Sequence, residues 1–169
     1  MTGPGLRLAR LEARHQLDGF GSGNEVLDSW LKRHALAAQQ MDTARTFVLV
    51  SPDGAVVGYF SLTMGAVLRQ DAPAKLVRGL PSYPVAMVLL ARLVVDRRHQ
   101  GSGRGGLLLT EALRKAVAAG EVAAARLVVV DAIDDDAVRF YARHGFSSLP
   151  GNPRRLFRRM IDVRASLGP

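Results

Sequence analysis

The sequence predicts one α/β domain, residues 1–169, built on a mixed β-sheet flanked by helices. Three observations carry this prediction. The length is usual for one domain. The apolar fraction of 48% and the charged fraction of 22% are typical of globular proteins. Segments with strand and helix periodicity follow one another in the order β-α-β-β-β-α-β-α-β-β, which is not a repeating βαβ array.

The N-terminal part predicts a strand and a helix. Residues 6–14 alternate apolar and polar side chains, as a half-buried strand does. A glycine-rich turn spans residues 19–23, and residues 24–41 then show helical spacing, with Asn24 as the N-cap. We expect the inward face of this helix to hold Val26, Leu27, Trp30, Leu31 and Ala35.

The central part predicts three strands. The first two, residues 46–50 and 55–68, are separated by the turn sequence Pro52-Asp53-Gly54. Residues 70–84 contain three prolines and predict a loop, with room for a short helix. Residues 85–96 are apolar throughout except for Arg92 and the final Asp96, so they predict a central strand covered on both faces.

The C-terminal part predicts two helices and three strands. A strand at 126–130 separates the helices 107–119 and 137–144, and three aspartates at 134–136 place negative charge where the helix dipole favours it. Gly145 is the expected C′ residue, and residues 146–149 and 156–163 are the expected closing strands. The first helix is expected to turn inward Leu107, Leu108, Ala112, Leu113 and Ala116.

The chain is basic, and its basic residues are nearly all arginines. Lysine and arginine number 23 against 15 acidic residues, a formal net charge of +8, and only three of the 23 are lysines. A GC-rich genome accounts for part of this preference, but the planar guanidinium also suits phosphate oxygens. From residue 143 onward Asp162 is the only acid in the sequence, which indicates a polyanionic partner such as nucleic acid; the arginines there are Arg143, Arg154, Arg155, Arg158, Arg159 and Arg164.

Composition also excludes several classes of protein. The absence of cysteine excludes a disulfide scaffold, a thiolate metal site and a cysteine nucleophile, and we expect no metal. No apolar run approaches the roughly 18 residues that a membrane helix needs. The N-terminal sequence contains Glu12 and lacks a secretory apolar core. The expectation is a cytoplasmic protein that does not bind membranes.

The segment Arg98-His99-Gln100-Gly101-Ser102-Gly103 carries the most chemical information. It follows a buried strand and opens a helix, where glycines and free N–H groups can bind a pyrophosphate. It is not a P-loop, because Gly103 is followed by Arg104 and Gly105 rather than by Gly-Lys-Ser/Thr. It also lies too late in the chain for the dinucleotide fingerprint of a first βαβ unit.

This Arg-x-x-Gly-x-Gly pattern resembles the acetyl-CoA site of the GNAT acyltransferase superfamily. The resemblance implies that acetyl-CoA is the cofactor, that the backbone of 101–106 wraps its pyrophosphate, and that strand residues 93–95 hydrogen-bond its pantetheine arm. The cofactor-binding residues implied in this way are Leu93, Val94, Val95, Arg98, Gln100, Gly101, Ser102, Gly103, Arg104, Gly105, Gly106 and Phe140.

A second motif, Ala137-Val138-Arg139-Phe140-Tyr141-Ala142-Arg143-His144-Gly145-Phe146, is similar to the ending Ala-x-x-Phe/Leu-Tyr-x-x-x-Gly-Phe of the same family. The resemblance implies that Tyr141 is the general acid that protonates the leaving thiolate. A tyrosine on an apolar helix face is by itself more often plain core. Its combination with the glycine loop favours the catalytic interpretation.

Further motifs resemble a narrower group, the tRNA-acetylating toxins of toxin–antitoxin pairs. They are Phe20 to Trp30, Gly58-Tyr59-Phe60, Leu80-Pro81 with Pro84, and Ala91 to Asp96. With the Phe140–Phe146 ending, the pattern runs along almost the whole chain, from about residue 15 to about residue 160. The chain departs from this pattern at Phe60, Ala91, Val94 and Asp131, the last standing where a histidine is common. The resemblance implies acetylation of the α-amino group of aminoacyl-tRNA, a ribbon-helix-helix antitoxin and a homodimer.

A tRNA substrate fits the charge, because nucleic-acid binding increases with the number of phosphates neutralised. The candidate contacts are Arg78, Arg92, Arg154, Arg155, Arg158 and Arg159. An α-ammonium group has a pKa of about 7.7–8.0, so no strong general base is required, and none is assigned among His99, His144 and Asp131.

Two other functions remain open from the sequence. One is a GNAT enzyme that acetylates a small amine or a protein N-terminus. The other is a catalytically idle GNAT fold that binds DNA or a partner protein, although Tyr141 and the glycine loop are both intact.

Overall fold

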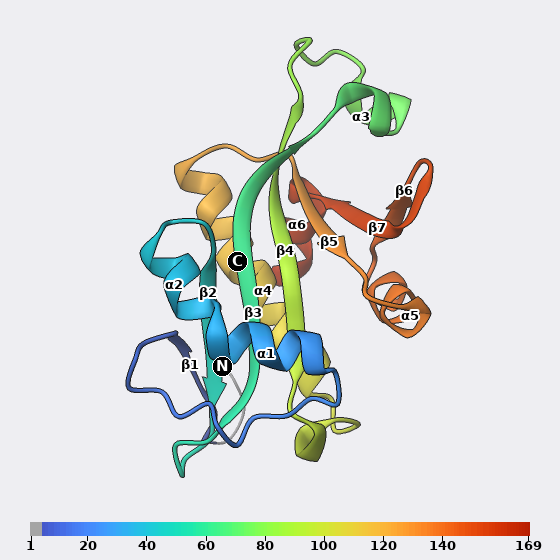
Figure 1. Cartoon of the computed structure of the whole chain (residues 1–169). Coiled ribbons are helices and arrows are strands. Elements are labelled where there is room, and N and C mark those ends of the chain that lie inside the picture. Colours follow the sequence, from blue (N-terminus) through green and yellow to red (C-terminus); the bar gives the residue numbers. More distant parts are fainter. Residues whose placement is uncertain (1–4) are drawn as a thin grey trace. The chain divides into compact units, whose positions relative to one another are not determined.

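The computed structural model describes residues 5–169 and confirms the expected mixed sheet (Figure 1). Seven strands hydrogen-bond in the order β1-β2-β3-β4-β5-β7-β6. The β4–β5 pair is parallel, whereas β1–β2, β2–β3, β5–β7 and β6–β7 are antiparallel. The described residues form two compact units, one of residues 5–63 and 91–112 and the other of residues 64–90 and 113–169. Each unit is described in turn.

The first unit packs two short helices against an antiparallel sheet. Its elements are β1 (Arg7–Arg10), α1 (Glu25–Arg33), α2 (Ala35–Gln40), β2 (Arg45–Val50), most of β3 (Val56–Val67), the end of β4 (Val85–Val95), the 3-10 turn η2 (Arg97–His99) and the start of α4 (Arg104–Val122). One core cluster joins Leu31 and Ala35 of the helices to Val48, Tyr59 and Val94 of the strands.

The helix expected over 24–41 is instead two helices. Asn24 is the N-cap of α1 as predicted, since its side chain accepts the N–H of Leu27. The helix ends at His34, whose N–H donates to the Trp30 carbonyl, and α2 begins at the next residue. Val26 was expected to face inward, and this is wrong, because Val26 is 75% exposed. Leu31 and Ala35, four positions apart, form the buried stripe instead.

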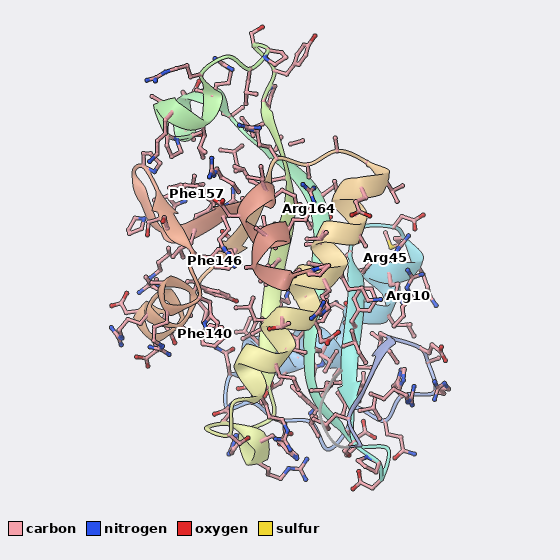
Figure 2. All side chains as sticks on the ribbon, turned by 180° about the vertical axis from the view of Figure 1, so that it is seen from behind. Arg10, Arg45, Phe140, Phe146, Phe157 and Arg164 are labelled. Atoms are coloured by element: carbon pink, nitrogen blue, oxygen red, sulfur yellow. The ribbon has the colours of Figure 1, made fainter. Side chains whose placement is uncertain are left out.

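The second unit surrounds a small sheet with helical segments. It contains the end of β3, the start of β4, η1 (Arg69–Asp71), α3 (Ala74–Val77), the end of α4, β5 (Leu127–Asp131), α5 (Asp135–Arg143), β6 (Ser147–Leu149), β7 (Asn152–Arg159) and α6 (Met160–Leu167). Met87 pairs with Leu127 and Val129 with Phe157, which places apolar residues of three strands in one cluster with Leu76 of α3. Figure 2 shows Phe140, Phe146 and Phe157 of this unit.

The helix boundaries at α5 follow the predicted chemistry. The Asp134 side chain accepts the N–H of Ala137, which is the expected role of an acid at a helix start. Gly145 has a φ of 90°, the left-handed conformation that ends a helix. These local signals act within one turn of the helix, so the sequence predicted them correctly.

The strand expected over 156–163 is wrong in its second half. The strand ends at Arg159, and residues 160–167 form α6. The buried side chains there are Met160 and Val163, three positions apart, which is the spacing of a helix rather than of a strand. The helix expected over 107–119 also begins three residues earlier, at Arg104, and Leu109 is buried where Leu107 is only half-buried.

A buried hydroxyl pair joins β2 to β3. Thr46 and Ser61 face each other in register, both are fully buried, and their side-chain oxygens lie 2.8 Å apart. Each hydroxyl therefore satisfies the other in a site without solvent.

This pair predicts an asymmetric effect of mutation. Thr46→Val leaves the Ser61 hydroxyl without a partner and should lower the free energy of unfolding by about 1–3 kcal/mol. The double variant Thr46→Val/Ser61→Ala removes both polar groups and should recover part of that loss. Urea unfolding measures both, and a double variant less stable than Thr46→Val would contradict the mutual satisfaction of the two hydroxyls.

Candidate active site

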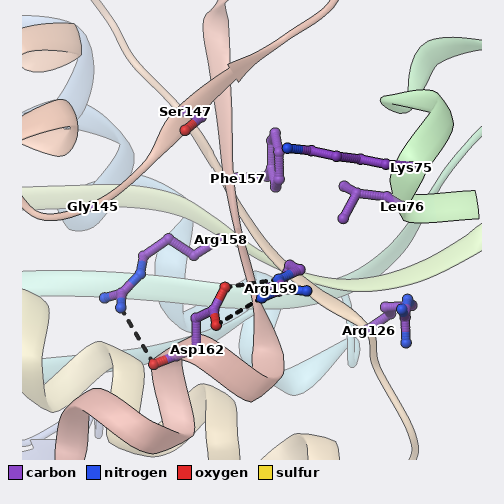
Figure 3. Close-up of a pocket in the computed structure, with 9 residues that line it drawn as sticks. All are labelled: Lys75, Leu76, Arg126, Gly145, Ser147, Phe157, Arg158, Arg159 and Asp162. Atoms are coloured by element: carbon purple, nitrogen blue, oxygen red, sulfur yellow. Dashed lines mark hydrogen bonds and ion pairs between the residues drawn. The ribbon is translucent and has the colours of Figure 1, made fainter.

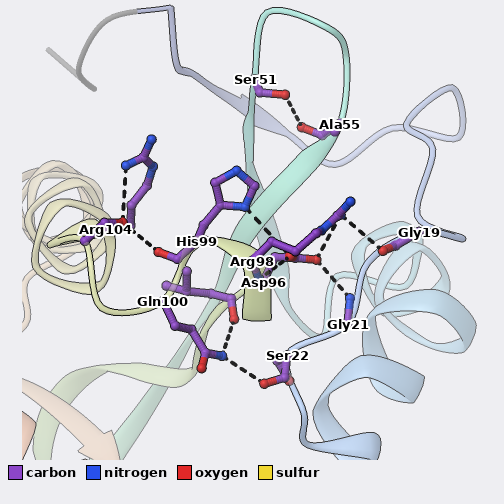
Figure 4. A network of polar contacts seen from close by, with 12 residues as sticks. Gly19, Gly21, Ser22, Ser51, Ala55, Asp96, Arg98, His99, Gln100 and Arg104 are labelled. Carbon is purple, nitrogen blue, oxygen red and sulfur yellow. Dashed lines mark hydrogen bonds and ion pairs between the residues drawn. The ribbon is translucent and has the colours of Figure 1, made fainter.

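The glycine loop of the first unit is anchored by one buried carboxylate. Asp96, at the end of β4, is 1% exposed. Its oxygens accept the N–H of Gly21 at 3.1 Å, the N–H of Arg98 at 2.9 Å and the Arg98 Nε at 3.0 Å (Figure 4). Burial alone would raise the pKa of this carboxyl, but the hydrogen bonds from Arg98 and Gly21 outweigh it and lower the pKa to about 2.

Further hydrogen bonds join the turn before α1, residues 19–23, to the loop. The Gln100 side chain donates to the carbonyls of Ser22 and Val95 at 2.8 and 2.9 Å, and the Arg97 N–H donates to the Gly21 carbonyl at 2.8 Å. Arg98 and Gln100 were implied as cofactor-binding residues, and their side chains are engaged within the protein. The backbone N–H groups of these two residues also donate within the protein, to Asp96 and to the Arg97 carbonyl, whereas the Arg98 side chain stays 63% exposed. The sequence marked residues 19–23 only as a turn.

The loop itself presents backbone donors. Gly101 and Gly103 have φ values of 78° and 80°, which L side chains rarely adopt, and an added Cβ would meet no atom within 4 Å at either position. Within the described chain, the N–H groups of residues 101–106 donate to no protein acceptor. They lie at the start of α4, so the helix dipole and these donors favour an anion at the same place.

Two side chains of the loop support the same interpretation. The Arg104 Nε is buried and has no hydrogen-bond partner among residues 5–169. The Ser102 hydroxyl donates to the His99 carbonyl at 2.8 Å, which fixes the turn. An unpartnered guanidinium nitrogen beside free N–H groups fits the pyrophosphate of a coenzyme.

Residues 93–95 of β4 lie beyond the β5 ladder, whose last pair is Leu90 with Val130. The Val95 carbonyl accepts the Gln100 side chain, and the other backbone groups on that side are left for another partner, as expected for a strand that binds an extended ligand. Val94 anchors the strand because its side chain belongs to the buried core cluster. The β3 strand passes close by, since a Cβ on Gly58 would lie 3.1 Å from the Val94 carbonyl oxygen.

Arg92, one residue before this strand end, lies over an aromatic pair. Its guanidinium carbon is 3.7 Å from the centroid of the Trp30 ring, which stacks on Tyr59. The Tyr59 hydroxyl donates to the Leu27 carbonyl at 2.7 Å and holds this arrangement to α1. Burial lowers the pKa of Arg92, yet an arginine remains charged. No acid of the described chain forms an ion pair with it.

Tyr141 of the second unit is buried on α5 at 5% exposure, between Phe140 and Phe146. Burial raises the pKa of its hydroxyl, and the Asp131 carboxylate raises it further. Its hydroxyl makes no hydrogen bond to any residue in the part of the chain that the structure describes. A phenol in this state stays protonated at neutral pH and can donate its proton to a ligand.

Two of the three groups considered as helpers are engaged within the protein. The Asp131 carboxylate forms a two-point ion pair with Arg155, at 2.8 and 3.2 Å, across the β5–β7 ladder. The His144 Nδ1 lies 2.8 Å from the Phe140 carbonyl oxygen. The His99 Nδ1 is buried and has no hydrogen-bond partner among residues 5–169, and it lies 3.7 Å from an Asp96 oxygen.

The arginines of β7 are largely neutralised by nearby acids. Arg154 pairs with Asp135 at 3.3 Å, Arg155 with Asp131, and Arg159 with Asp162 at 2.8 Å. Of the four arginines of β7, Arg158 has no carboxylate partner within residues 5–169. Arg78, at the end of α3, is likewise unpaired among these residues and is exposed. Charge counted along the sequence therefore overstates the charge that is available to a partner.

The glycine loop and the open end of β4 define an α/β protein that binds a phosphorylated coenzyme. Residues 13–146 match the Acetyltransferase (GNAT) family, and the chain belongs to this family. Acetyl-CoA is the coenzyme of the family, and the free N–H groups and the Arg104 Nε fit its pyrophosphate. The protein is therefore an acyltransferase of the acetyl-CoA-dependent type.

Two relatives, one of them in two solved structures, resemble the chain along nearly its whole length. A tRNA-acetylating toxin of Mycobacterium tuberculosis (strain ATCC 25618 / H37Rv) is 38% identical, with 94% of this chain and 95% of that protein covered. The solved structure of AtaT complexed with acetyl-methionyl-tRNAfMet has 26% identity and a TM-score of 0.88, covering 95% of this chain and 98% of that one. A mutant AtaT toxin bound to the C-terminus of the antitoxin AtaR and acetyl-CoA has 25% identity and a TM-score of 0.82, with 97% and 99% covered.

Two negative findings concern the described residues 5–169. They contain no group of three or more histidine, cysteine, aspartate or glutamate side chains that could hold a metal ion. They also contain no helix that is both long and apolar enough to cross a membrane.

The Asp96 anchor predicts a pH-dependent stability. Its pKa lies below the usual value of 3.8, so ionised Asp96 stabilises the folded protein above pH 4, and this contribution is lost as the pH falls toward 2. Asp96→Asn should lower the free energy of unfolding at pH 7 by about 2 kcal/mol, and the difference from wild type should shrink below pH 4.

Urea unfolding between pH 7 and pH 2.5 tests this expectation. Asp136→Asn is the control, because the ion pair of Asp136 with Arg139 is exposed and should matter little. A difference for Asp96→Asn that stays constant over the whole pH range would show that the carboxylate charge is not what anchors the loop.

Proposed function

We propose that this protein transfers the acetyl group of acetyl-CoA to the α-amino group of aminoacyl-tRNA and so blocks translation in the cytoplasm, where that substrate is found. The observation that carries the proposal is the loop 101–106, with its free N–H groups at the start of α4. The tRNA-acetylating relative at 38% identity and the AtaT complex with an acetylated tRNA support the choice of acceptor.

The chain's own residues would hold the coenzyme in a fixed order. The N–H groups of 101–106 and the Arg104 Nε would bind the pyrophosphate, and the open backbone of residues 93–95 would bind the amides of the pantetheine arm. Phe140 would also contact the coenzyme. When bound, acetyl-CoA supplies the acetyl group as an activated thioester.

Tyr141 would provide the proton that the leaving group needs. When bound, the thioester would be open to attack by the neutral amine of the acceptor, so that a C–N bond forms and the C–S bond breaks. The Tyr141 hydroxyl would donate its proton to the departing sulfur, the amine would release one proton to solvent, and the Tyr141 phenolate would take one proton back from solvent. Because burial keeps the phenol protonated, the donor is ready at every physiological pH. The amine itself has a pKa of about 7.7–8.0 and needs no strong base.

Arg92 would face the acceptor. If the pantetheine arm follows residues 95 to 93 away from the pyrophosphate loop, its acetyl end points toward residue 92. The guanidinium there is held flat on Trp30 and has no acidic partner among the described residues, so it is suited to a phosphate near the 3′ end of the tRNA. Arg78 is a second exposed candidate.

We also propose that the protein forms a homodimer and is held inactive by an antitoxin of the ribbon-helix-helix type. The AtaT toxin bound to the C-terminus of AtaR supports an antitoxin. The dimer and the antitoxin fold rest on the resemblance to the toxin group.

The coenzyme site predicts that Gly103→Glu abolishes acetyl-CoA binding. The substitution adds a side chain at a φ of 80° and a negative charge where the pyrophosphate would lie. Gly54→Glu is a matched control in the same unit, with a φ of 88° and no neighbour within 4 Å of an added Cβ. Calorimetry should find no binding to the first variant and near wild-type affinity for the second; wild-type affinity in Gly103→Glu would refute the site.

The proton donor predicts that Tyr141→Phe lowers the transfer rate by about 10²–10⁴-fold without unfolding the protein. Tyr83→Phe, at a residue 72% exposed, is the control and should be unaffected. The measurement is acetylation of charged tRNA and of free amino acids, together with growth arrest on expression. An unchanged rate in folded Tyr141→Phe would remove Tyr141 as the acid, and acetylation of free amines alone would favour a small-molecule enzyme.

A further inference from the structure

A cationic pocket lies in the second unit, between α3, the start of β5 and β7. Its volume is about 490 Å³, and the charged side chains that line it are four cations and one acid: Lys75, Arg126, Arg158, Arg159 and Asp162. Figure 3 shows these side chains around Phe157. None of the motifs that define the coenzyme site contributes a charged residue to this pocket.

Three of the four cations have no acidic partner in the described part of the chain. Asp162 is taken by Arg159, which donates to its two oxygens at 2.8 and 3.0 Å. Arg158 reaches only the Asp162 backbone carbonyl, at 3.4 Å. Lys75 and Arg126 make no ion pair with residues 5–169. The pocket therefore gathers uncompensated positive charge, whereas Arg154 and Arg155 of the same strand are neutralised.

The pocket has one apolar side. Leu76 is 4% exposed, and the half-buried Phe157 packs against the core cluster to which Leu76 belongs. Lys75 and Arg126 are exposed and Arg158 is half-buried, so a polyanion in solvent can reach these cations.

The geometry of β7 keeps the pocket open. The strand β6 pairs with β7 only as far as Phe157, which faces Ser147, and β7 continues past it to Arg158 and Arg159. Gly145, at the rim, leaves room for Arg158, because a Cβ there would lie 3.3 Å from the Arg158 Nε. The Arg158 guanidinium lies 5.9 Å from the centroid of the Phe146 ring and donates to the Asp162 carbonyl at 3.4 Å, so no carboxylate is needed to position it.

We propose that this pocket binds phosphodiester groups of the RNA acceptor, through Lys75, Arg126 and Arg158. Two planar guanidinium groups and one ammonium group suit phosphate oxygens, and the aromatic Phe157 offers a face to a sugar or base. The inference rests on the proposed function for the identity of the RNA. It assigns the RNA contact to Arg158 of β7, which is unpaired, together with Lys75 and Arg126. The paired Arg154, Arg155 and Arg159 are not assigned to this contact.

The test compares two triple variants with equal change in net charge. The pocket variant is Lys75→Gln/Arg126→Gln/Arg158→Gln, and the control is Arg139→Gln/Arg154→Gln/Arg155→Gln, whose three arginines are paired with acids and lie outside the pocket. Binding of uncharged tRNA is measured against salt concentration, which needs no acetyl transfer. The pocket variant should bind about tenfold or more weakly, and the slope of log K against log salt should become shallower by about 2–3. The control should change the slope by less than 1.

Further measurements distinguish RNA from acetyl-CoA as the source of phosphate, and RNA from an acidic peptide as the partner. Acetyl-CoA affinity, measured by calorimetry, should be the same in both variants and in wild type; a loss confined to the pocket variant would assign the pocket to the coenzyme and overturn the proposal. Equal slopes in the two variants would also overturn it. Wild-type tRNA binding with lost binding of poly-L-glutamate would identify an acidic peptide as the ligand instead. If wild type binds tRNA through the pocket but acetylates only free amines, the proposed function fails and the pocket stands.

Discussion

The buried carboxylate of Asp96 is the interaction on which the coenzyme site depends. It lies where β4 ends, and it collects N–H groups from the turn before α1 and from the start of the loop. A buried ionised group is tolerated only when its hydrogen-bonding capacity is filled, and here the loop and the turn fill it. Fixing residues 96–100 in this way turns the side chains of Arg98 and Gln100 toward the protein, so the backbone of 101–106 is left to face a ligand.

In the second unit, burial controls the protonation state of Tyr141. The phenol is enclosed by Phe140 and Phe146, and no hydrogen-bond acceptor of the described chain reaches its hydroxyl. Desolvation then favours the neutral form, and the Asp131 charge acts in the same direction. Arg155 holds that carboxylate in an ion pair, so Asp131 influences Tyr141 as a fixed charge rather than as a base.

Ion pairing with nearby acids decides which cations of this protein remain available to a partner. Ion pairs hold Arg139, Arg154, Arg155 and Arg159 against nearby acids. Two cations that form no ion pair with the described residues lie on aromatic surfaces instead: Arg92 is on Trp30, and Arg158 is beside Phe146 and Phe157. An unpaired cation beside an apolar surface binds an anion more strongly than a solvated one, because less water competes.

The sequence by itself determined most of the order of strands and helices, the caps at Asn24 and Gly145, the acidic start of α5 at Asp134, and the glycine loop that opens α4, because these features depend on residues within a few positions of one another. The family motifs also identified the class of enzyme. Tertiary structure alone decided the break at His34, the helix after Arg159, the use of Arg98 and Gln100 inside the protein, and which arginines are neutralised. Asp131 is 24 residues from Arg155, and the two meet only because β5 and β7 pair in one particular register. Such contacts are fixed by the packing of distant strands, which no local pattern of residues encodes.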